Sequence, residues 1–115
     1  MINKGLIIEA KTHAEFLNKV FGCNYKTWQK STYELKNENK VIWMIRIDSI
    51  KRNGFRNYIL EDKIVECSNE KTRSLKNRLV FQITEIGGKR YYEYLGEYVL
   101  DKSTVDQFET IFTKI

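Results

Sequence analysis

The strongest constraint on the fold is a long alternating stretch that is broken once, by a pair of glycines. From Arg78 to Ile86, apolar side chains occupy every second position, and Arg90 to Leu100 alternates in the same way. Gly87-Gly88 lies between the two runs and suits a tight turn with positive φ angles. This pattern predicts a β-hairpin, and because a lone hairpin is barely stable in water, further strands must pack with it.

The return strand of this hairpin carries two further signals. We expect its larger apolar side chains to share one side of the sheet, namely Tyr92, Tyr94, Tyr98 and Leu100. Gly96 lies inside the strand, where glycine indicates a bulge or a close backbone approach.

Shorter apolar runs predict the other strands. Val41 to Asp48 begins apolar on both faces and ends alternating, as expected for a central strand whose far end meets water. The Asn53-Gly54 turn should join it to a strand around Tyr58 to Leu60, which continues or restarts at Ile64-Val65. Two more candidates lie near the ends of the chain, at Leu6 to Glu9 and at Thr110 to Ile115.

One helix is expected from Thr12 to Phe21. Thr12 and Glu15 have capping-box spacing, in which each side chain satisfies a backbone N–H of the first turn. Apolar residues recur at helical spacing after them, and Gly22 stands where a C-terminal cap belongs. Residues 23–39 are polar and predict a loop with a helical turn or short strand, and residues 103–109 leave a second helix open.

These elements predict an α+β fold, a mostly antiparallel curved sheet or partial β-barrel of about five to six strands with one or two helices. A chain of 115 residues fits a single domain, 1–115. Its apolar runs are too short for a membrane span or a signal peptide, so we expect no membrane partner and a cytoplasmic location. Cys23 and Cys67 fit that location as two buried thiols, with a disulfide between them as the less favoured alternative.

No catalytic or metal centre is expected from the residue types. The chain has one histidine, His13, predicted to be exposed on the first helical turn, and its two cysteines lie far apart in sequence. The tripeptides Glu9-Ala10-Lys11 and Glu34-Leu35-Lys36 resemble the Glu-x-Lys element of metal-dependent nucleases. The first lacks an acidic residue upstream, so the sequence predicts neither enzyme activity nor a cofactor.

Charge suggests binding instead. The net charge is +5, and the excess lies in residues 1–60, which have eleven Lys/Arg and five Asp/Glu. A basic surface of this kind attracts polyanions, and arginine suits bidentate phosphate contacts. The cations predicted to bind nucleic acid are Arg46, Lys51, Arg52, Arg56, Arg73 and Arg78.

Aromatic side chains offer stacking faces for unpaired bases. Trp28 lies in a polar segment between Lys26 and Lys30, and it is the aromatic residue we most expect outside the core. Trp43 is the second candidate for stacking.

The C-terminal part also resembles a known group of domains. Arg78-Leu79-Val80-Phe81, the hairpin, Tyr92-x-Tyr94-Leu95-Gly96-x-Tyr98-x-Leu100 and the closing Thr110 to Ile115 resemble the end of PUA-like domains. This group includes SRA, EVE and YTH domains and modules attached to restriction endonucleases. The resemblance covers residues 78–115 and implies a partial barrel that binds nucleic acid, often with a modified base in an aromatic cage. No pocket residue transfers from it.

Two functions follow as hypotheses. The first is a PUA-like module that binds DNA or RNA in a restriction or defence context and reads a modified or flipped base. The second is a small immunity, inhibitor or anti-defence protein that docks on a single protein partner through the same arginines and aromatics.

Overall fold

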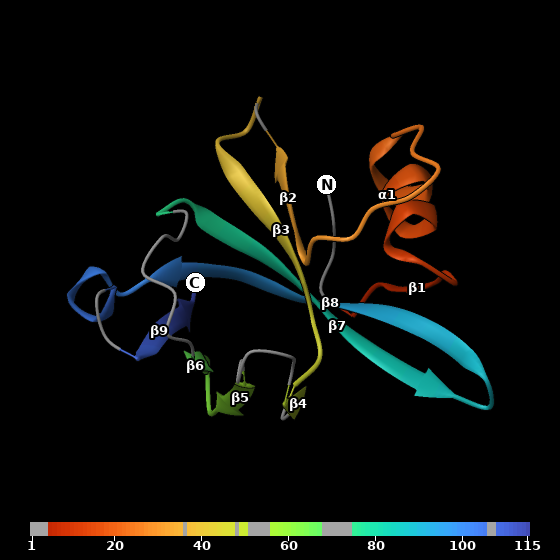
Figure 1. The fold of residues 1–115 in the computed structure, drawn as a ribbon. Helices are drawn as coiled ribbons and strands as arrows, with labels where there is room; N and C mark the ends of the chain where they lie inside the picture. Colours follow the sequence, from red (N-terminus) through yellow and green to blue (C-terminus); the bar gives the residue numbers. More distant parts are fainter. Residues whose placement is uncertain (1–4, 36, 48, 51–55, 68–74, 106–107) are drawn as a thin grey trace.

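The computed structural model describes residues 5–35, 37–47, 49–50, 56–67, 75–105 and 108–115. Within these ranges, nine strands join into one sheet, accompanied by one α-helix, α1 (His13–Phe21), and a short 3-10 helix (Lys102–Thr104) (Figure 1). The strands are β1 (Ile7–Glu9), β2 (Thr32–Leu35), β3 (Lys40–Ile45), β4 (Ser49–Ile50), β5 (Arg56–Leu60), β6 (Lys63–Cys67), β7 (Asn77–Ile86), β8 (Lys89–Leu100) and β9 (Glu109–Lys114). The predicted class is confirmed, but the expectation of five to six strands was too low.

The sheet is open, with the order β2-β3-β7-β8-β9-β6-β5-β4, and β1 pairs with β8. Every pair is antiparallel except β3 with β7, which is parallel. The predicted hairpin is confirmed in position but not in its first strand, because β5 pairs antiparallel with the short strand β4, whereas β3 pairs with β2 and β7. Asn53-Gly54 lies outside the described residues.

The hairpin of β7 and β8 forms the centre of the sheet (Figure 1) and contains the predicted bulge. Val80 pairs with Gly96 but Phe81 pairs with Tyr94, so Leu95 is an extra residue. Gly96 has a φ angle of 126°, which glycine tolerates best. Because an extra residue reverses the alternation of side chains, the expectation that all four large residues share a side is wrong.

The first core lies between α1 and one face of the central strands. Phe16 and Leu17 of α1 are fully buried there, and Phe16 stacks on Tyr92 of β8 with ring centres 4.3 Å apart. Residues of β3, β7 and β8 complete this layer, namely Ile42, Met44, Leu79, Phe81, Ile83 and Tyr94. Apolar burial on one helical face therefore fixes α1 on this side of the sheet.

The second core lies on the opposite face of β3 and β7 and shows that the sheet is curved. It contains Tyr98 and Leu100, which follow the bulge, together with Trp43, Ile45, Ile64, Val80 and Phe112. The rings of Trp43 and Phe112 lie 4.9 Å apart although β7 and β8 separate their strands in the sheet. Such a contact requires the sheet to curl over this face.

The ends of α1 follow the predicted chemistry closely. The Glu15 amide donates to the Thr12 hydroxyl at 3.1 Å, and Gly22 ends the helix with a φ angle of 67°. The Glu15 carboxylate accepts from the Lys11 amide at 3.0 Å, one residue before the position expected for a capping box. These contacts fix the entry and exit of α1.

Cys23 and Cys67 are free thiols, and Cys67 is buried as expected, whereas Cys23 is only partly buried. In the part of the chain that the structure describes, no helix has the length and apolar character needed to cross a membrane.

Candidate nucleic-acid interface

An aromatic cluster forms where the chain leaves α1 and enters β2. The ring of Trp28 lies 4.8 Å from that of Tyr25 and 5.4 Å from that of Tyr33, measured between centres. Trp28 is half-buried, whereas Tyr25 is exposed. Part of the indole therefore packs on the first core while part meets solvent, as predicted for this residue alone among the aromatics.

Hydrogen bonds hold this segment in place even though it lacks regular structure. The Asn18 side chain of α1 accepts from the Tyr25 amide and donates to the Tyr25 carbonyl, both at 2.9 Å. The Trp28 Nε1–H donates to the Thr32 carbonyl at 3.2 Å at the start of β2. The indole is thus oriented by backbone and not free to rotate.

Tyr33 anchors the floor of the cluster. Its hydroxyl accepts a hydrogen bond from the Cys23 thiol at 3.3 Å, and its ring lies 6.4 Å from Phe21. The contact with Cys23, followed by burial, raises the pKa of Tyr33. Tyr33 therefore stays protonated, and its neutral ring forms one side of the aromatic cluster.

These rings line a hollow of about 750 Å³. Apart from Leu35, the rest of its lining is polar and includes Lys30 before β2, Glu34 in β2, and Asn37 and Glu38 in the turn after it. A volume of this order accommodates a small planar molecule, and aromatic faces beside carboxylate, amide and ammonium groups are suited to stacking with polar contacts at the edges.

The lysines predicted beside Trp28 lie on the surface of this region. Lys26 and Lys30 are both exposed, and Lys30 lines the hollow directly. At its border, Lys76 pairs with Glu34 at 3.2 Å. Trp28 and Lys30 therefore line the same hollow, and their role in binding stays a prediction.

Two predicted binding residues lie inside the protein instead. Trp43 is 1% exposed in the second core, so no base can stack on it, and the prediction for this residue is wrong. Arg78 is 4% exposed, because its guanidinium lies against the adjacent rings of Trp43 and Phe112 and pairs with Glu66 at 3.9 Å. Arg78 is thus a core residue and not a phosphate ligand.

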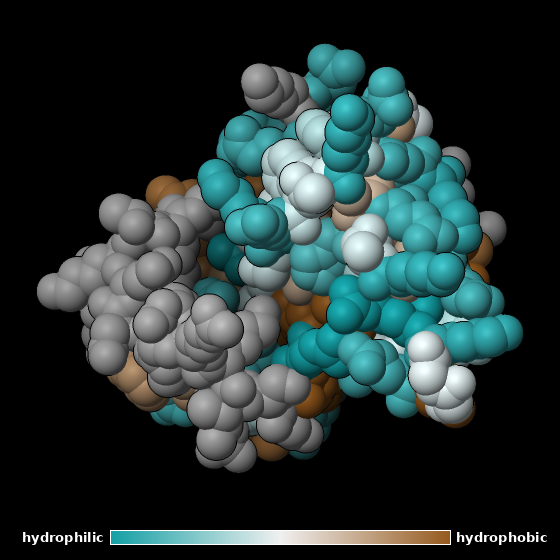
Figure 2. All heavy atoms as spheres, turned by 45° about the vertical axis from the view of Figure 1, so that its right-hand side comes forward, coloured by the Kyte–Doolittle hydropathy of each residue, from teal (hydrophilic) through white to brown (hydrophobic). Residues whose placement is uncertain are grey.

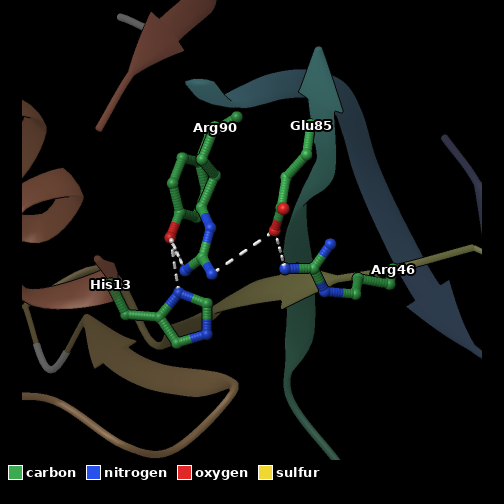
Figure 3. Close-up of polar contacts among 5 residues, drawn as sticks. His13, Arg46, Glu85 and Arg90 are labelled. Carbon is green, nitrogen blue, oxygen red and sulfur yellow. Dashed lines mark hydrogen bonds and ion pairs between the residues drawn. The ribbon is translucent and has the colours of Figure 1, made fainter. Parts of the chain in front are cut away.

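Arg46 belongs to a polar network at the other end of α1 (Figure 3). Its guanidinium donates to the Glu85 carboxylate, which also pairs with Arg90 at 3.5 Å. Arg90 in turn lies 3.5 Å from the Tyr92 hydroxyl. Hydrogen bonding from Arg46 lowers the pKa of Glu85, so the carboxylate stays charged between two guanidinium groups.

His13 completes this network and corrects the expectation of an exposed histidine. Its Nδ1 lies 2.7 Å from the Tyr92 hydroxyl, and the imidazole is half-buried. Burial raises the pKa of Tyr92, with Arg90 acting in the opposite direction. Tyr92 thus links His13 of α1 with Arg90 of β8.

The remaining predicted cations are not tested. Lys51, Arg52 and Arg73 lie outside the described residues, and the structure describes Arg56 only as part of β5, without its side chain. Figure 2 shows a mainly hydrophilic face on the α1 side, with apolar atoms visible chiefly in a recess.

Sequence reasoning missed Tyr25, Tyr33 and Arg90. Tyr25 is three residues before Trp28, and this short separation within a loop could have indicated that the two rings lie close together. Tyr33 and Arg90 required knowledge of strand pairing, because β2 joins the sheet only through β3 and Arg90 meets Glu85 across the hairpin.

Among the described residues, no group of three or more His, Cys, Asp or Glu side chains could hold a metal ion. Glu9 and Lys11 do line a small hollow together with Glu85. However, two arginines already neutralise Glu85, which disfavours a divalent cation there.

Comparisons with protein families and with curated proteins found no match to this chain. Among solved structures, the chain is similar to the 5-hydroxymethylcytosine-specific restriction enzyme AbaSI, with a TM-score of 0.70 and 20% sequence identity. The match covers 96% of this chain and 38% of the enzyme's chain. The two proteins therefore share a fold, in agreement with the expected likeness to modules of restriction endonucleases, and this chain corresponds to only part of the enzyme.

Proposed function

We propose that this chain binds nucleic acid, DNA or RNA, and holds one unpaired base against Trp28 in the aromatic hollow. The observation that carries the proposal is the partly exposed indole of Trp28 in a hollow of about 750 Å³ with Lys30 at its edge. Stacking of one base on an aromatic ring contributes about 1–3 kcal/mol. Lysines beside such a ring add phosphate contacts that weaken with salt.

The lining of the hollow supports a base in preference to an apolar ligand. Glu34, Asn37 and Glu38 place carboxylate and amide groups beside the rings, and such groups pair with the donors and acceptors of a base edge. The Trp28 indole is held by the Thr32 carbonyl, so little side-chain entropy is lost when a base stacks on it.

The shared fold with AbaSI supports a role in a restriction or defence context. That enzyme is specific for 5-hydroxymethylcytosine. Modified cytosines are therefore the first bases to test here, and we propose that this chain reads the base without cutting the strand itself.

Fluorescence anisotropy with labelled oligonucleotides tests this function. Single- and double-stranded oligonucleotides that contain cytosine, 5-methylcytosine or 5-hydroxymethylcytosine are titrated at about 50 and 200 mM salt. We expect Trp28→Ala to weaken binding by about 10- to 100-fold, the loss of one stacked base. Lys102→Gln, a change at an exposed lysine that lies outside the hollow, is the matched control.

Trp28 also packs on the first core, so Trp28→Phe is needed beside Trp28→Ala. We expect the phenyl ring to retain stacking and much of the affinity, while a merely structural loss would appear in thermal unfolding of both variants. If the folded Trp28→Ala protein binds every oligonucleotide as tightly as the unaltered protein does, the proposal is wrong. Failure of all oligonucleotides to bind would favour a protein partner.

A further inference from the structure

A cationic site lies away from the aromatic hollow. The end of β1 with the residues after it and the β7–β8 turn border a hollow of about 260 Å³, which Lys11, Lys89 and Arg90 line together with Glu9 and Glu85. Arg46 lies next to this hollow, because its guanidinium pairs with the Glu85 carboxylate. We call Lys11, Arg46, Glu85, Lys89 and Arg90 the rim.

Strand alternation explains why the rim is polar. Arg46 and Glu85 each follow a buried residue of the first core by two positions, after Met44 and Ile83, and Arg90 precedes Tyr92 by two. Side chains two apart share a face of the sheet, so the three polar groups continue the face that α1 covers. Arg46, Glu85 and Arg90 therefore lie at the border of the first core, where they contact one another and are exposed to solvent.

The balance of charge in the rim is positive. The rim and its hollow contain four cations, Lys11, Arg46, Lys89 and Arg90, and two carboxylates, Glu9 and Glu85, which gives a net charge of about +2. Glu85 cannot neutralise both guanidinium groups that it joins. Its role is instead to hold them side by side, since it contacts each of them.

The two guanidinium groups retain donors for a ligand. Among the described residues, Arg46 uses one terminal nitrogen, toward Glu85, and Arg90 uses two, toward Glu85 and Tyr92. A guanidinium has five N–H donors, and its fork fits the oxygens of a phosphate group. Their side chains are 37% and 28% exposed, so they are accessible to an anion from solvent.

We infer that the rim is a phosphate-binding site in which Arg46 and Arg90 contact the anion and Lys11 and Lys89 complete its neutralisation. The hollow is smaller than the 300–1,000 Å³ typical of small-molecule sites, so it suits a phosphate group and not a whole nucleotide. The same chemistry serves a nucleic-acid phosphodiester or free phosphate. If the ligand is a nucleic-acid phosphodiester, the inference rests on the proposed function.

Backbone amide NMR tests the site with inorganic phosphate and, separately, with a short oligonucleotide. We expect saturable shifts at the amides of Lys11, Gly88 and Lys89 with inorganic phosphate. The double variant Lys11→Gln/Lys89→Gln changes two exposed side chains and should weaken this binding at least about tenfold, whereas Lys102→Gln should not. For the oligonucleotide, log affinity falls with log salt concentration, and the double variant should make this slope shallower by about 1 for each lysine removed.

The two ligands distinguish the sources of phosphate and separate this inference from the proposed function. Shifts at the rim with both ligands support a phosphodiester contact, and shifts with inorganic phosphate alone support a site for free phosphate. An oligonucleotide that binds in a Trp28-dependent manner without shifting the rim, together with no response to phosphate, overturns the inference and leaves the proposed function intact. Equal phosphate affinity in the double variant and the unaltered protein also overturns it.

Discussion

The guanidinium carbon of Arg78 lies 4.4 Å from the centre of the Trp43 ring, and both side chains are buried. The Phe112 ring lies 4.3 Å from the same carbon, and Glu66 of β6 provides the opposite charge. Contact with two ring faces and with a carboxylate offsets the cost of burying this arginine. This contact therefore joins β3, β6, β7 and β9 across the curved sheet.

Arg78→Ala should destabilise the fold. We expect a loss of about 2–4 kcal/mol in the free energy of unfolding, because the variant leaves Glu66 near the core without its arginine and opens a space beside two rings. Urea denaturation followed by far-ultraviolet circular dichroism measures this loss. Arg46→Ala, at an exposed ion pair, is the matched control and should cost less than about 1 kcal/mol. Similar losses in the two variants would contradict the core role of Arg78.

Thr12→Ala removes the hydroxyl that accepts from the Glu15 amide. The first turn of α1 then loses its N-cap, and we expect about 1 kcal/mol less stability. Thr27→Ala, at an exposed loop position, should change the free energy of unfolding by less than about 0.5 kcal/mol. An equal effect of both substitutions in thermal or urea denaturation would show that the cap is not stabilising.

Gly96→Ala places a side chain where the φ angle is 126°. L-residues rarely adopt this conformation, and we expect a cost of about 1–3 kcal/mol together with altered pairing near Val80. Amide hydrogen exchange across β7 and β8 locates the change, and Val99→Ala on the same strand is the control. An unchanged exchange pattern and unchanged stability would contradict the need for glycine at the bulge.

The pKa of Glu85 is lowered from its ordinary value of 4.5, chiefly by the hydrogen bond from Arg46. A carboxyl group with a lowered pKa in the folded state stabilises the fold above its ordinary pKa, and this contribution is lost as pH falls through the folded value. Arg46→Gln should therefore raise the pKa of Glu85 in a carboxyl carbon NMR titration. Lys40→Gln, which removes one partner of Glu97, should leave the pKa of Glu85 unchanged. A Glu85 pKa that does not respond to Arg46→Gln would refute this coupling.

Local patterns predicted the parts of the fold that depend on neighbours in sequence. Capping chemistry placed α1 almost to the residue, and alternation with Gly87-Gly88 placed β7 and β8. The face of the sheet on which each side chain lies was harder to predict from the sequence. One extra residue at Leu95 moved Tyr98 and Leu100 to the second core, and nothing in an alternating pattern reveals which face a bulge selects.

The candidate site was only partly predictable for a related reason. Trp28 lies in a polar segment, so its partial exposure followed from its neighbours. The environments of Trp43 and Arg78 depend on β9, which brings Phe112 to them from a distant part of the chain. The parallel pairing of β3 with β7 also aligns Arg46 near Glu85, and that long-range register has no short sequence signal.

The indole N–H resonances of the two tryptophans provide the most direct test of the central claim. Trp28 lines the hollow and Trp43 is sealed in the second core, so each protein molecule contains its own control. On titration with a single-stranded oligonucleotide, the Trp28 resonance should shift and saturate while the Trp43 resonance stays in place. Binding with no shift at Trp28, or with equal shifts at both indoles, would contradict a base held in the aromatic hollow.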